Sequence, residues 1–254
     1  MTAQQIENAK ELAIIMKLKR FAGRLGKEYA LFKRACPYYD TLQQAVGNEI
    51  KKHYKKRVQK IIRVIEIGCG TGGTTTIIIE SDPRVRVIAI DNEKSMIEQA
   101  RHNLAKYAEK GRLKIVEGDS LRILQETPAD SCDVVASALT IHNFEKNYRL
   151  KLLLEAYRIL KKGGLFVNSD KYLSDEKQKR KAIREWQFKQ YAKLKDKRLI
   201  NAWMAHDLED EKPDRIMKEK EAIKQIAKAG FGEIKITFRK KMHATISAVK
   251  VIPS

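Results

Sequence analysis

Residues 64–72 read VIEIGCGTG, an apolar run that ends in three glycines spaced two residues apart. The apolar run predicts a buried strand, and the glycines predict a tight turn at its end. Glycine allows a sharp backbone turn and lets a ligand approach where a Cβ would clash. A strand that leads into such a turn is typical of sites where the backbone meets a nucleotide or nucleoside.

Asp91, nineteen residues after Gly72, ends a second apolar run, Val85–Ile90. The spacing leaves room for one helix between the two predicted strands. A carboxylate at the tip of the second strand is placed to accept hydrogen bonds from both hydroxyls of a ribose. The two runs together predict a site for a cofactor that carries a nucleoside.

The glycine spacing departs from the dinucleotide fingerprint, whose final glycine follows two residues rather than one. Glu66 stands at the strand tip, where it would repel a phosphate but suits a cationic or amino-bearing ligand. These features favour S-adenosylmethionine, which has a sulfonium and an ammonium group and no phosphate. The alternative is a structural glycine turn without a ligand.

Asp119 follows another short apolar run, Leu113–Val116. Its position predicts the same sheet edge as Asp91, where a carboxylate can accept a hydrogen bond from the adenine amino group. Asp is also a strong helix N-cap, so a capping role is the alternative, and the two roles are compatible.

Alternating strand and helix patterns predict an α/β fold with a doubly wound, Rossmann-like parallel sheet. A short basic turn joins the last two strands, so we expect them to pair as a terminal antiparallel hairpin. The expected strands are 61–67, 85–90, 113–116, 132–137, 165–169, 232–238 and 244–251, and the expected helices are 41–54, 73 onward, 92–110, 148–160, 174–204 and 213–229.

We expect a single domain, because no low-complexity linker or repeat divides the chain. Apolar residues recur at helical spacing over 5–34 and predict one or two amphipathic helices there. The acidic stretch 207–214 is expected to be a solvated loop. The expected parts are a helical N-terminal cap (1–60), a cofactor-binding core (61–170), a helical insert on the substrate side after the fifth strand (171–212), and a last helix with the hairpin (213–254).

The 254 residues carry a formal net charge of +20. Residues 1–60 have 14 basic against 5 acidic residues, and residues 146–200 have 17 against 6. Such a surface favours anionic partners, which are RNA, acidic metabolites or membrane headgroups, and the alternative is a solvated lysine-rich surface. Three widely spaced cysteines without a C-x-x-C pattern predict a reduced, cytoplasmic protein without a metal site. No apolar run reaches the roughly 20 residues that span a bilayer.

The chain resembles the class I S-adenosylmethionine-dependent methyltransferases over about residues 61–170. The matching residues are the stretch 66–72, Asp91-Asn92, Gly118-Asp119, the helix 150–160 and the stretch 161–167. The resemblance implies a seven-stranded sheet with a terminal hairpin, glycines 68, 70 and 72 beside the methionine portion, and the two aspartates beside ribose and adenine. The predicted cofactor residues are Tyr39, Glu66, Gly68, Cys69, Gly70, Gly72, Asp91, Asn92, Met96, Asp119, Ser120 and Ser137.

A weaker resemblance is carried by Arg34-x-x-Pro37-x-Tyr39, Ile88–Asn92, Met96-Ile97, Glu117–Asp119, Ser169–Tyr172, Lys197-Arg198 and Ala229–Phe231. These residues resemble the carboxy-S-adenosylmethionine synthase branch, which remakes the cofactor for a tRNA wobble-uridine modification. The chain departs from that branch at Glu66 and Thr71, and again at Ala138–His142. An arginine for the added carboxylate therefore has no firm assignment. The residues that we predict on the substrate side are Lys171, Tyr172, Trp186, Arg198 and Trp203.

His142, just past the fourth strand, is the candidate general base, because its unperturbed pKa suits that role. The alternative is a histidine that only satisfies loop carbonyls. The leading hypothesis is methyl transfer to a small or anionic acceptor, with a small molecule or tRNA as partner and a homodimer as a possible assembly. The alternatives are a carboxy-S-adenosylmethionine synthase-like enzyme and a non-catalytic S-adenosylmethionine- or RNA-binding protein.

Overall fold

The computed structural model describes residue 33 and residues 36–251; most of the predicted helical region 5–34 lies outside them. The described residues form a seven-stranded sheet with the order β3-β2-β1-β4-β5-β7-β6. β1 to β5 run parallel, and β7 is antiparallel to both β5 and β6. The strands are β1 (Ile62–Ile67), β2 (Val85–Asp91), β3 (Leu113–Glu117), β4 (Cys132–Ala138), β5 (Leu160–Lys171), β6 (Gly232–Lys240) and β7 (His243–Val249).

This topology confirms the predicted Rossmann-like sheet with a terminal hairpin. The central strands β1 and β4 are mostly apolar and largely buried, because helices cover both of their faces. In β1, Val64 packs into the cluster beneath α4 and α5, whereas Ile65 and Ile67 face the cluster beneath α8, α9 and α12. The sheet therefore separates two hydrophobic cores.

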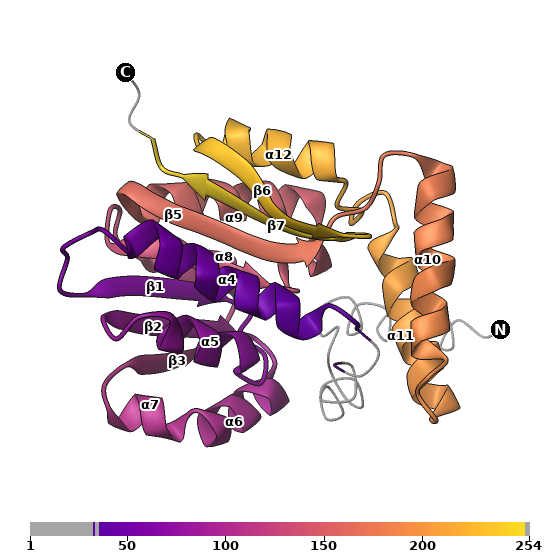
Figure 1. The fold of residues 1–254 in the computed structure, drawn as a ribbon, viewed down its shortest axis with the longest axis horizontal. Coiled ribbons are helices and arrows are strands. Elements are labelled where there is room, and N and C mark those ends of the chain that lie inside the picture. The colour runs from indigo at the N-terminus through magenta and orange to yellow at the C-terminus, as the bar shows by residue number, and fades with distance from the viewer. Residues whose placement is uncertain (1–32, 34–35, 252–254) are drawn as a thin grey trace, which may run out of the picture.

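The helices lie on both faces of the sheet, and two of them stand beyond its edge (Figure 1). α10 and α11 lie at the end toward which β5 points, where their buried side chains pack against Tyr39, Leu42 and Leu139. Among the described residues, no helix is long and apolar enough to cross a bilayer. The helices are α4 (Tyr39–Tyr54), α5 (Gly73–Ser81), α6 (Lys94–Asn103), α7 (Ala105–Glu109), α8 (Ser120–Glu126), the 3-10 helix η1 (Ile141–Asn143), α9 (Lys146–Ile159), α10 (Lys177–Tyr191), α11 (Lys197–Asp210) and α12 (Glu219–Lys228).

The region 174–204, predicted to be helical, forms two separate helices, α10 and α11. The predicted loop 207–214 is wrong over residues 207–210, which belong to α11. Asp196 accepts hydrogen bonds from the backbone N–H groups of Arg198 and Leu199, so it caps a new helix, α11. α11 continues to Asp210, and both Asp207 and Asp210 are buried rather than solvated. The predicted helix 92–110 is likewise divided, at Leu104, into α6 and α7.

α4, the described helix of the N-terminal cap, docks tightly against the core. A Cβ on Gly47 would lie 2.7 Å from Ile77 Cγ2, so this glycine allows α4 and α5 to approach closely. At the other end of α4, the buried Tyr54 hydroxyl donates a 2.7 Å hydrogen bond to the backbone carbonyl of Asp133 in β4. These contacts fix the cap to the strand that ends at the site described below.

We expect Tyr54→Phe to lower the free energy of unfolding by about 1–3 kcal/mol, because it leaves the buried Asp133 carbonyl without this donor. Urea unfolding monitored by circular dichroism measures the change. Tyr157→Phe is the matched control, since its hydroxyl makes a longer, 3.3 Å bond at a half-buried position and should matter less. Equal effects of the two substitutions would contradict this account of α4 docking.

Candidate cofactor site

The turn after β1 is held against the tip of β2. The backbone N–H groups of Gly68 and Cys69 both donate to the carbonyl of Ile90, each at 2.9 Å. Gly70 has a φ of +53°, and a Cβ built on it would meet nothing within 4 Å. A Cβ on Gly68 would instead collide with Thr140 from the loop after β4. Gly70 is therefore the glycine whose missing side chain leaves open space.

Asp91 organises this turn as well as ending β2. Its Oδ2 accepts a 2.8 Å hydrogen bond from the backbone N–H of Gly70, and its Oδ1 accepts from that of Glu93 at 2.9 Å. Burial raises the pKa of Asp91, and these backbone donors act in the opposite direction. The carboxylate thus stands at the carboxyl edge of the sheet, in the position that the ribose prediction requires.

A cavity opens at the carboxyl ends of β1 to β4, beside Gly70 and Asp91. It includes Asn143, Phe144 and Tyr148, which follow β4 and which the sequence reasoning did not identify. No local motif marks these three positions, although their place just after β4 is a usable signal. The predicted cofactor residues that line the cavity are Tyr39, Gly68, Cys69, Gly70, Asp91, Asn92, Met96, Asp119 and Ser120.

Asp119 lines the cavity and also caps α8. Its Oδ1 accepts a 2.9 Å hydrogen bond from the backbone N–H of Arg122, and its Oδ2 accepts from the Tyr148 hydroxyl at 2.9 Å. Asp119 therefore has the predicted capping role. Its carboxylate still lines the cavity, and the adenine role stays a prediction.

Three predicted cofactor residues do not line the cavity. Glu66 is fully buried, and its Oε2 accepts a 2.6 Å hydrogen bond from Thr75 Oγ1 in α5. Ser137 is also buried and donates to the carbonyl of Ile67 at 3.0 Å. Gly72 packs against Leu104, where a Cβ would lie only 2.5 Å from the leucine side chain. These three residues contact the protein interior next to the turn, and none of them reaches the cavity.

His142 lies in η1, next to the cavity residue Asn143, but its side chain belongs to a second, neighbouring cavity. The ring Nδ1 lies 2.5 Å from Asp170 Oδ1, and the backbone N–H of His142 donates to Asp170 Oδ2 at 3.1 Å. The side chain is 6% exposed. The predicted general base is therefore not part of the cofactor cavity wall.

None of the five predicted substrate residues lines the cofactor cavity, and only Lys171 lines the second one. Lys171 is buried and donates to Asp207 Oδ1 at 2.6 Å. Tyr172 and Trp203 are core residues, whereas Arg198 is exposed at the start of α11. Trp186, half-buried in α10, stacks on Tyr38 with ring centroids 6.2 Å apart.

A doubly wound sheet with a carboxylate-lined cavity at its carboxyl edge is typical of α/β proteins that bind a nucleoside. Residues 64–164 match the family model described as a methyltransferase domain. The carboxy-S-adenosyl-L-methionine synthase of Klebsiella pneumoniae is 27% identical over 144 residues, 56% of this chain and 55% of that protein.

Two further proteins extend the comparison beyond this segment. The Shewanella piezotolerans protein of the same name as the Klebsiella synthase is 24% identical over 227 residues, 87% of each chain. The structure of the CurJ carbon methyltransferase has a TM-score of 0.59 at 19% identity, over 83% of this chain and 54% of that one. The chain spans about half the length of the first curated relatives it matches.

The family-model match over residues 64–164 and these relatives support the predicted resemblance to the class I S-adenosylmethionine-dependent methyltransferases, with S-adenosylmethionine as the cofactor. The cavity residues fit this molecule. None of the described residues that line the cavity is Lys or Arg, and Asp91, Glu93 and Asp119 are acids. A cationic ligand without phosphates suits such a wall better than a dinucleotide does.

We expect Gly70→Val to abolish S-adenosylmethionine binding, because its side chain would enter the open space of the cavity. Isothermal titration calorimetry measures the loss. Gly111→Val is the matched control: Gly111 also has a positive φ, +64°, and open space around it, yet lies outside the cavity. The substitution should cause similar backbone strain and leave binding unchanged. Normal binding by a folded Gly70→Val variant would contradict the site.

Burial raises the pKa of Glu66 to about 8, and the hydrogen bond from Thr75 only partly opposes this. The folded chain therefore keeps a proton on Glu66 that the unfolded chain releases. The corresponding stability is complete below about pH 4.5 and is lost as the pH rises through about 8, by at most about 1.4 kcal/mol per pH unit.

In Glu66→Gln, we expect this pH-dependent loss to disappear, so the variant gains stability relative to the parent between about pH 4.5 and 8. Urea unfolding of both chains across this pH range measures the difference. Glu109→Gln, a change at an exposed position, should leave the pH profile as it is. Parallel profiles for the Glu66→Gln variant and the parent chain would overturn the assignment of a protonated Glu66.

Proposed function

We propose that this chain transfers the methyl group of S-adenosylmethionine to an acceptor that binds against Tyr39, Asn143 and Phe144. The observation that carries the proposal is the acid-lined cavity at the carboxyl ends of β1 to β4, to which these three residues also contribute. They come from α4 and from the segment after β4, outside the glycine turn and the ribose-side carboxylate. This division leaves one part of the wall for the cofactor and another for the acceptor.

The chemistry asks little of the protein beyond alignment, because the sulfonium already activates the methyl group. None of the described residues that line the cavity is a histidine. Burial raises the pKa of the Tyr148 hydroxyl, which donates to Asp119 and is therefore a poor base. The acceptor itself is expected to supply the nucleophile, as an anion or a neutral amine. The role of Asp91 and Gly70 is to hold the cofactor.

The second candidate is a carboxy-S-adenosylmethionine synthase-like activity, which is favoured by the names of the curated relatives. Two observations weigh against it. Arg198, an arginine predicted on the substrate side, is exposed on α11 outside the cavity, and the Lys171 ammonium donates its hydrogen bond to Asp207. Methyl transfer requires neither side chain.

Mass spectrometry of small molecules released from the purified chain, and of products formed from added S-adenosylmethionine and candidate acceptors, tests the proposal. We expect S-adenosylhomocysteine to form with an acceptor of the right class, and not to form in the Gly70→Val variant. A sulfonium product that has gained a carboxylate would instead establish the synthase activity. Cofactor binding with neither product across anionic and amine acceptors would favour a non-catalytic protein.

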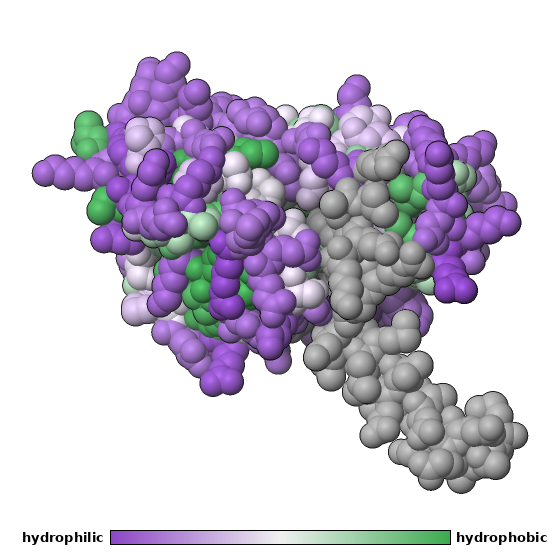
Figure 2. Space-filling view, turned by 90° about the horizontal axis from the view of Figure 1, so that it is seen from below, coloured by the Kyte–Doolittle hydropathy of each residue, from purple (hydrophilic) through white to green (hydrophobic). Residues whose placement is uncertain are grey.

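An anionic acceptor, either tRNA or an acidic metabolite, is favoured by the exposed basic side chains of α10. Lys177, Lys179 and Lys181 are exposed, whereas Arg180 is half-buried and donates to the carbonyls of Ser174 and Asp175. Hydrophilic side chains also cover most of the face seen from below, around a smaller apolar area (Figure 2). The competing explanation is that the basic side chains of α10 belong to a generally hydrophilic surface without a specific partner. A variant that removes lysines from α10 must therefore be compared with one that removes the same number of lysines elsewhere.

If α10 contacts tRNA, replacing Lys177, Lys179 and Lys181 with Gln should weaken binding and reduce the log–log salt slope by about one for each phosphate that the variant no longer neutralises. Gel shifts with total tRNA at two salt concentrations measure both. The control replaces Lys110, Lys114 and Lys162, which are exposed near the amino ends of β3 and β5. Equal losses in the two triple variants would indicate nonspecific attraction, and no binding by the parent chain would exclude tRNA.

We also propose a reducing, cytoplasmic setting. Cys36, Cys69 and Cys132 are all free and buried. Burial raises the pKa of the Cys36 thiol to about 11 and that of Cys132 to about 12, so neither is poised to form a thiolate. Core thiols of this kind behave as small apolar side chains.

A further inference from the structure

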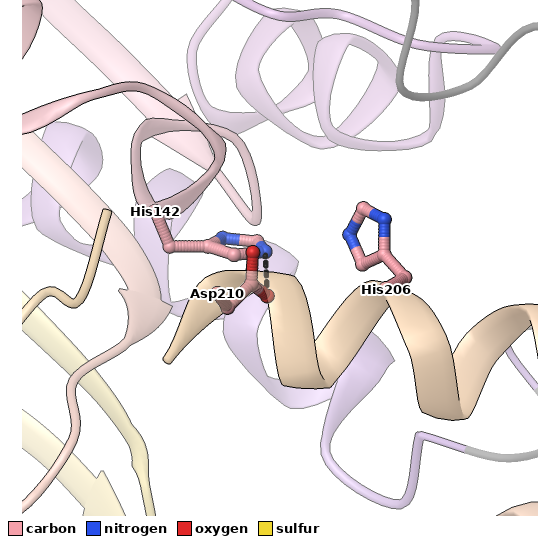
Figure 3. A group of neighbouring side chains, drawn as sticks. All are labelled: His142, His206 and Asp210. Atoms are coloured by element: carbon pink, nitrogen blue, oxygen red, sulfur yellow. Dashed lines mark ion pairs between the residues drawn. The ribbon is translucent and has the colours of Figure 1, made fainter. Parts of the chain in front are cut away.

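Among the residues that the structure describes, one group of three His, Cys, Asp or Glu side chains is arranged to share an ion. His142 comes from η1, and His206 and Asp210 come from α11 (Figure 3). One ligand atom from each lies within 4.8 Å of the others, and all three side chains are buried. The group lies beside the second cavity, which His142 and Asp210 both line.

His142 is oriented as metal-binding histidines usually are. Its Nδ1 lies 2.5 Å from Asp170 Oδ1, which leaves Nε2 for a ligand, and Nε2 lies 3.6 Å from Asp210 Oδ2. Ligating histidines almost always donate their other ring N–H to a carboxylate, a carbonyl or water. Tetrahedral coordination at about 2.0–2.1 Å requires ligand atoms roughly 3.4 Å apart, close to this separation.

His206 and Asp210 are four residues apart on α11, so they lie on the same face of the helix. In Figure 3 the His206 ring stands further from Asp210 than the His142 ring does. Because all three ligand atoms lie within 4.8 Å of one another, no pair has to close by more than about 1.4 Å to reach the tetrahedral separation, and rotation of a histidine side chain can provide such a movement.

The charged groups around the site include both acids and bases. Asp170, Asp207 and Asp210 are buried carboxylates, the buried Lys171 ammonium lies near Asp207 and Asp210, and Arg180 and Arg184 line the same cavity. The Lys171 Nζ lies 2.6 Å from Asp207 but 3.8 Å from Asp210, so its hydrogen bond is committed to Asp207. Asp210 is the carboxylate that lies 3.6 Å from His142 Nε2, so it brings a negative charge to the point where a cation would bind.

We propose that His142, His206 and Asp210 bind a divalent transition-metal ion, with Zn²⁺ as the best match to two imidazoles and one carboxylate. Three protein ligands leave a fourth position for water or for an oxygen atom of a bound molecule, which the second cavity can admit. Asp170 acts as the positioning residue for His142. The site does not depend on the proposed methyl transfer, because none of the three ligands lines the cofactor cavity.

The competing account is a buried ion-pair network in which a protonated His142 lies between Asp170 and Asp210. It explains the same short contacts without a metal, and it predicts that the chain takes up no zinc at this position. Zinc binding to the whole chain, measured without reference to catalysis, separates the two accounts.

The experiment is calorimetric titration of Zn²⁺ into the chain after EDTA treatment, with Co²⁺ absorption as a reporter of tetrahedral coordination. We expect one ion per chain. Asp170→Asn should weaken binding by about 10–100-fold, as the loss of a ligand's hydrogen-bonding partner does, and His206→Gln should weaken it further. The matched control is His102→Gln, a change at an exposed histidine of α6 that should bind zinc normally.

Thermal melting with and without Zn²⁺ checks that the variants fold, and zinc should raise the Tm of the parent and the His102→Gln variant more than that of the other variants. Asp210→Asn serves as a second ligand variant if His206→Gln does not fold. Absence of zinc binding by the parent chain would overturn the proposal outright. So would unchanged affinity in His206→Gln, or an equal loss in His102→Gln.

Discussion

The attachment of the glycine turn to the tip of β2 is the constraint on which the site depends. The Ile90 carbonyl accepts two backbone hydrogen bonds from the turn, and Asp91 accepts a third from Gly70. The residue that is predicted to bind the ribose therefore also shapes the turn beside it. Loss of this carboxylate would remove hydrogen bonds that hold the turn as well as the predicted ligand contact.

The sheet and most of the cofactor cavity could be predicted from sequence, because local pattern fixes them. The glycine turn, Asp91 and Asp119 each follow an apolar strand, and the carboxyl ends of parallel strands meet at one edge. The side-chain alternation of β1 also contained the information that the Glu66 prediction missed. Glu66 is two residues from Val64 and therefore shares the face that packs against α5.

The second cavity could not be predicted in this way. Asp207 and Asp210 looked solvated because they are acidic, yet they continue a buried stripe of α11 that begins at Leu199 and Trp203. The orientation of His142 depends on Asp170, 28 residues away, and its neighbour on α11 is 64 residues away in sequence. No local spacing connects residues on such distant segments, so only the tertiary structure brings them together.

η1 is the wall between the two cavities, since Asn143 faces one and His142 faces the other. This three-residue helix thus contributes a polar side chain to each cavity. The cofactor cavity has no histidine among its described lining residues, whereas the second cavity gathers His142 with buried acids. A movement of η1 would therefore change the walls of both cavities at once.

The insert that contains α10 and α11 is joined to the core by Asp207, which accepts from Lys171 at the end of β5 and from Tyr191 of α10. Removing one partner of a buried ion pair costs far more than replacing both with apolar groups. An insert exchanged with that of a relative must therefore bring an acid for Lys171, or the lysine must change with it. At this contact, a substitution of Asp207 is expected to require a matching substitution of Lys171. The exposed positions of the insert carry no such constraint.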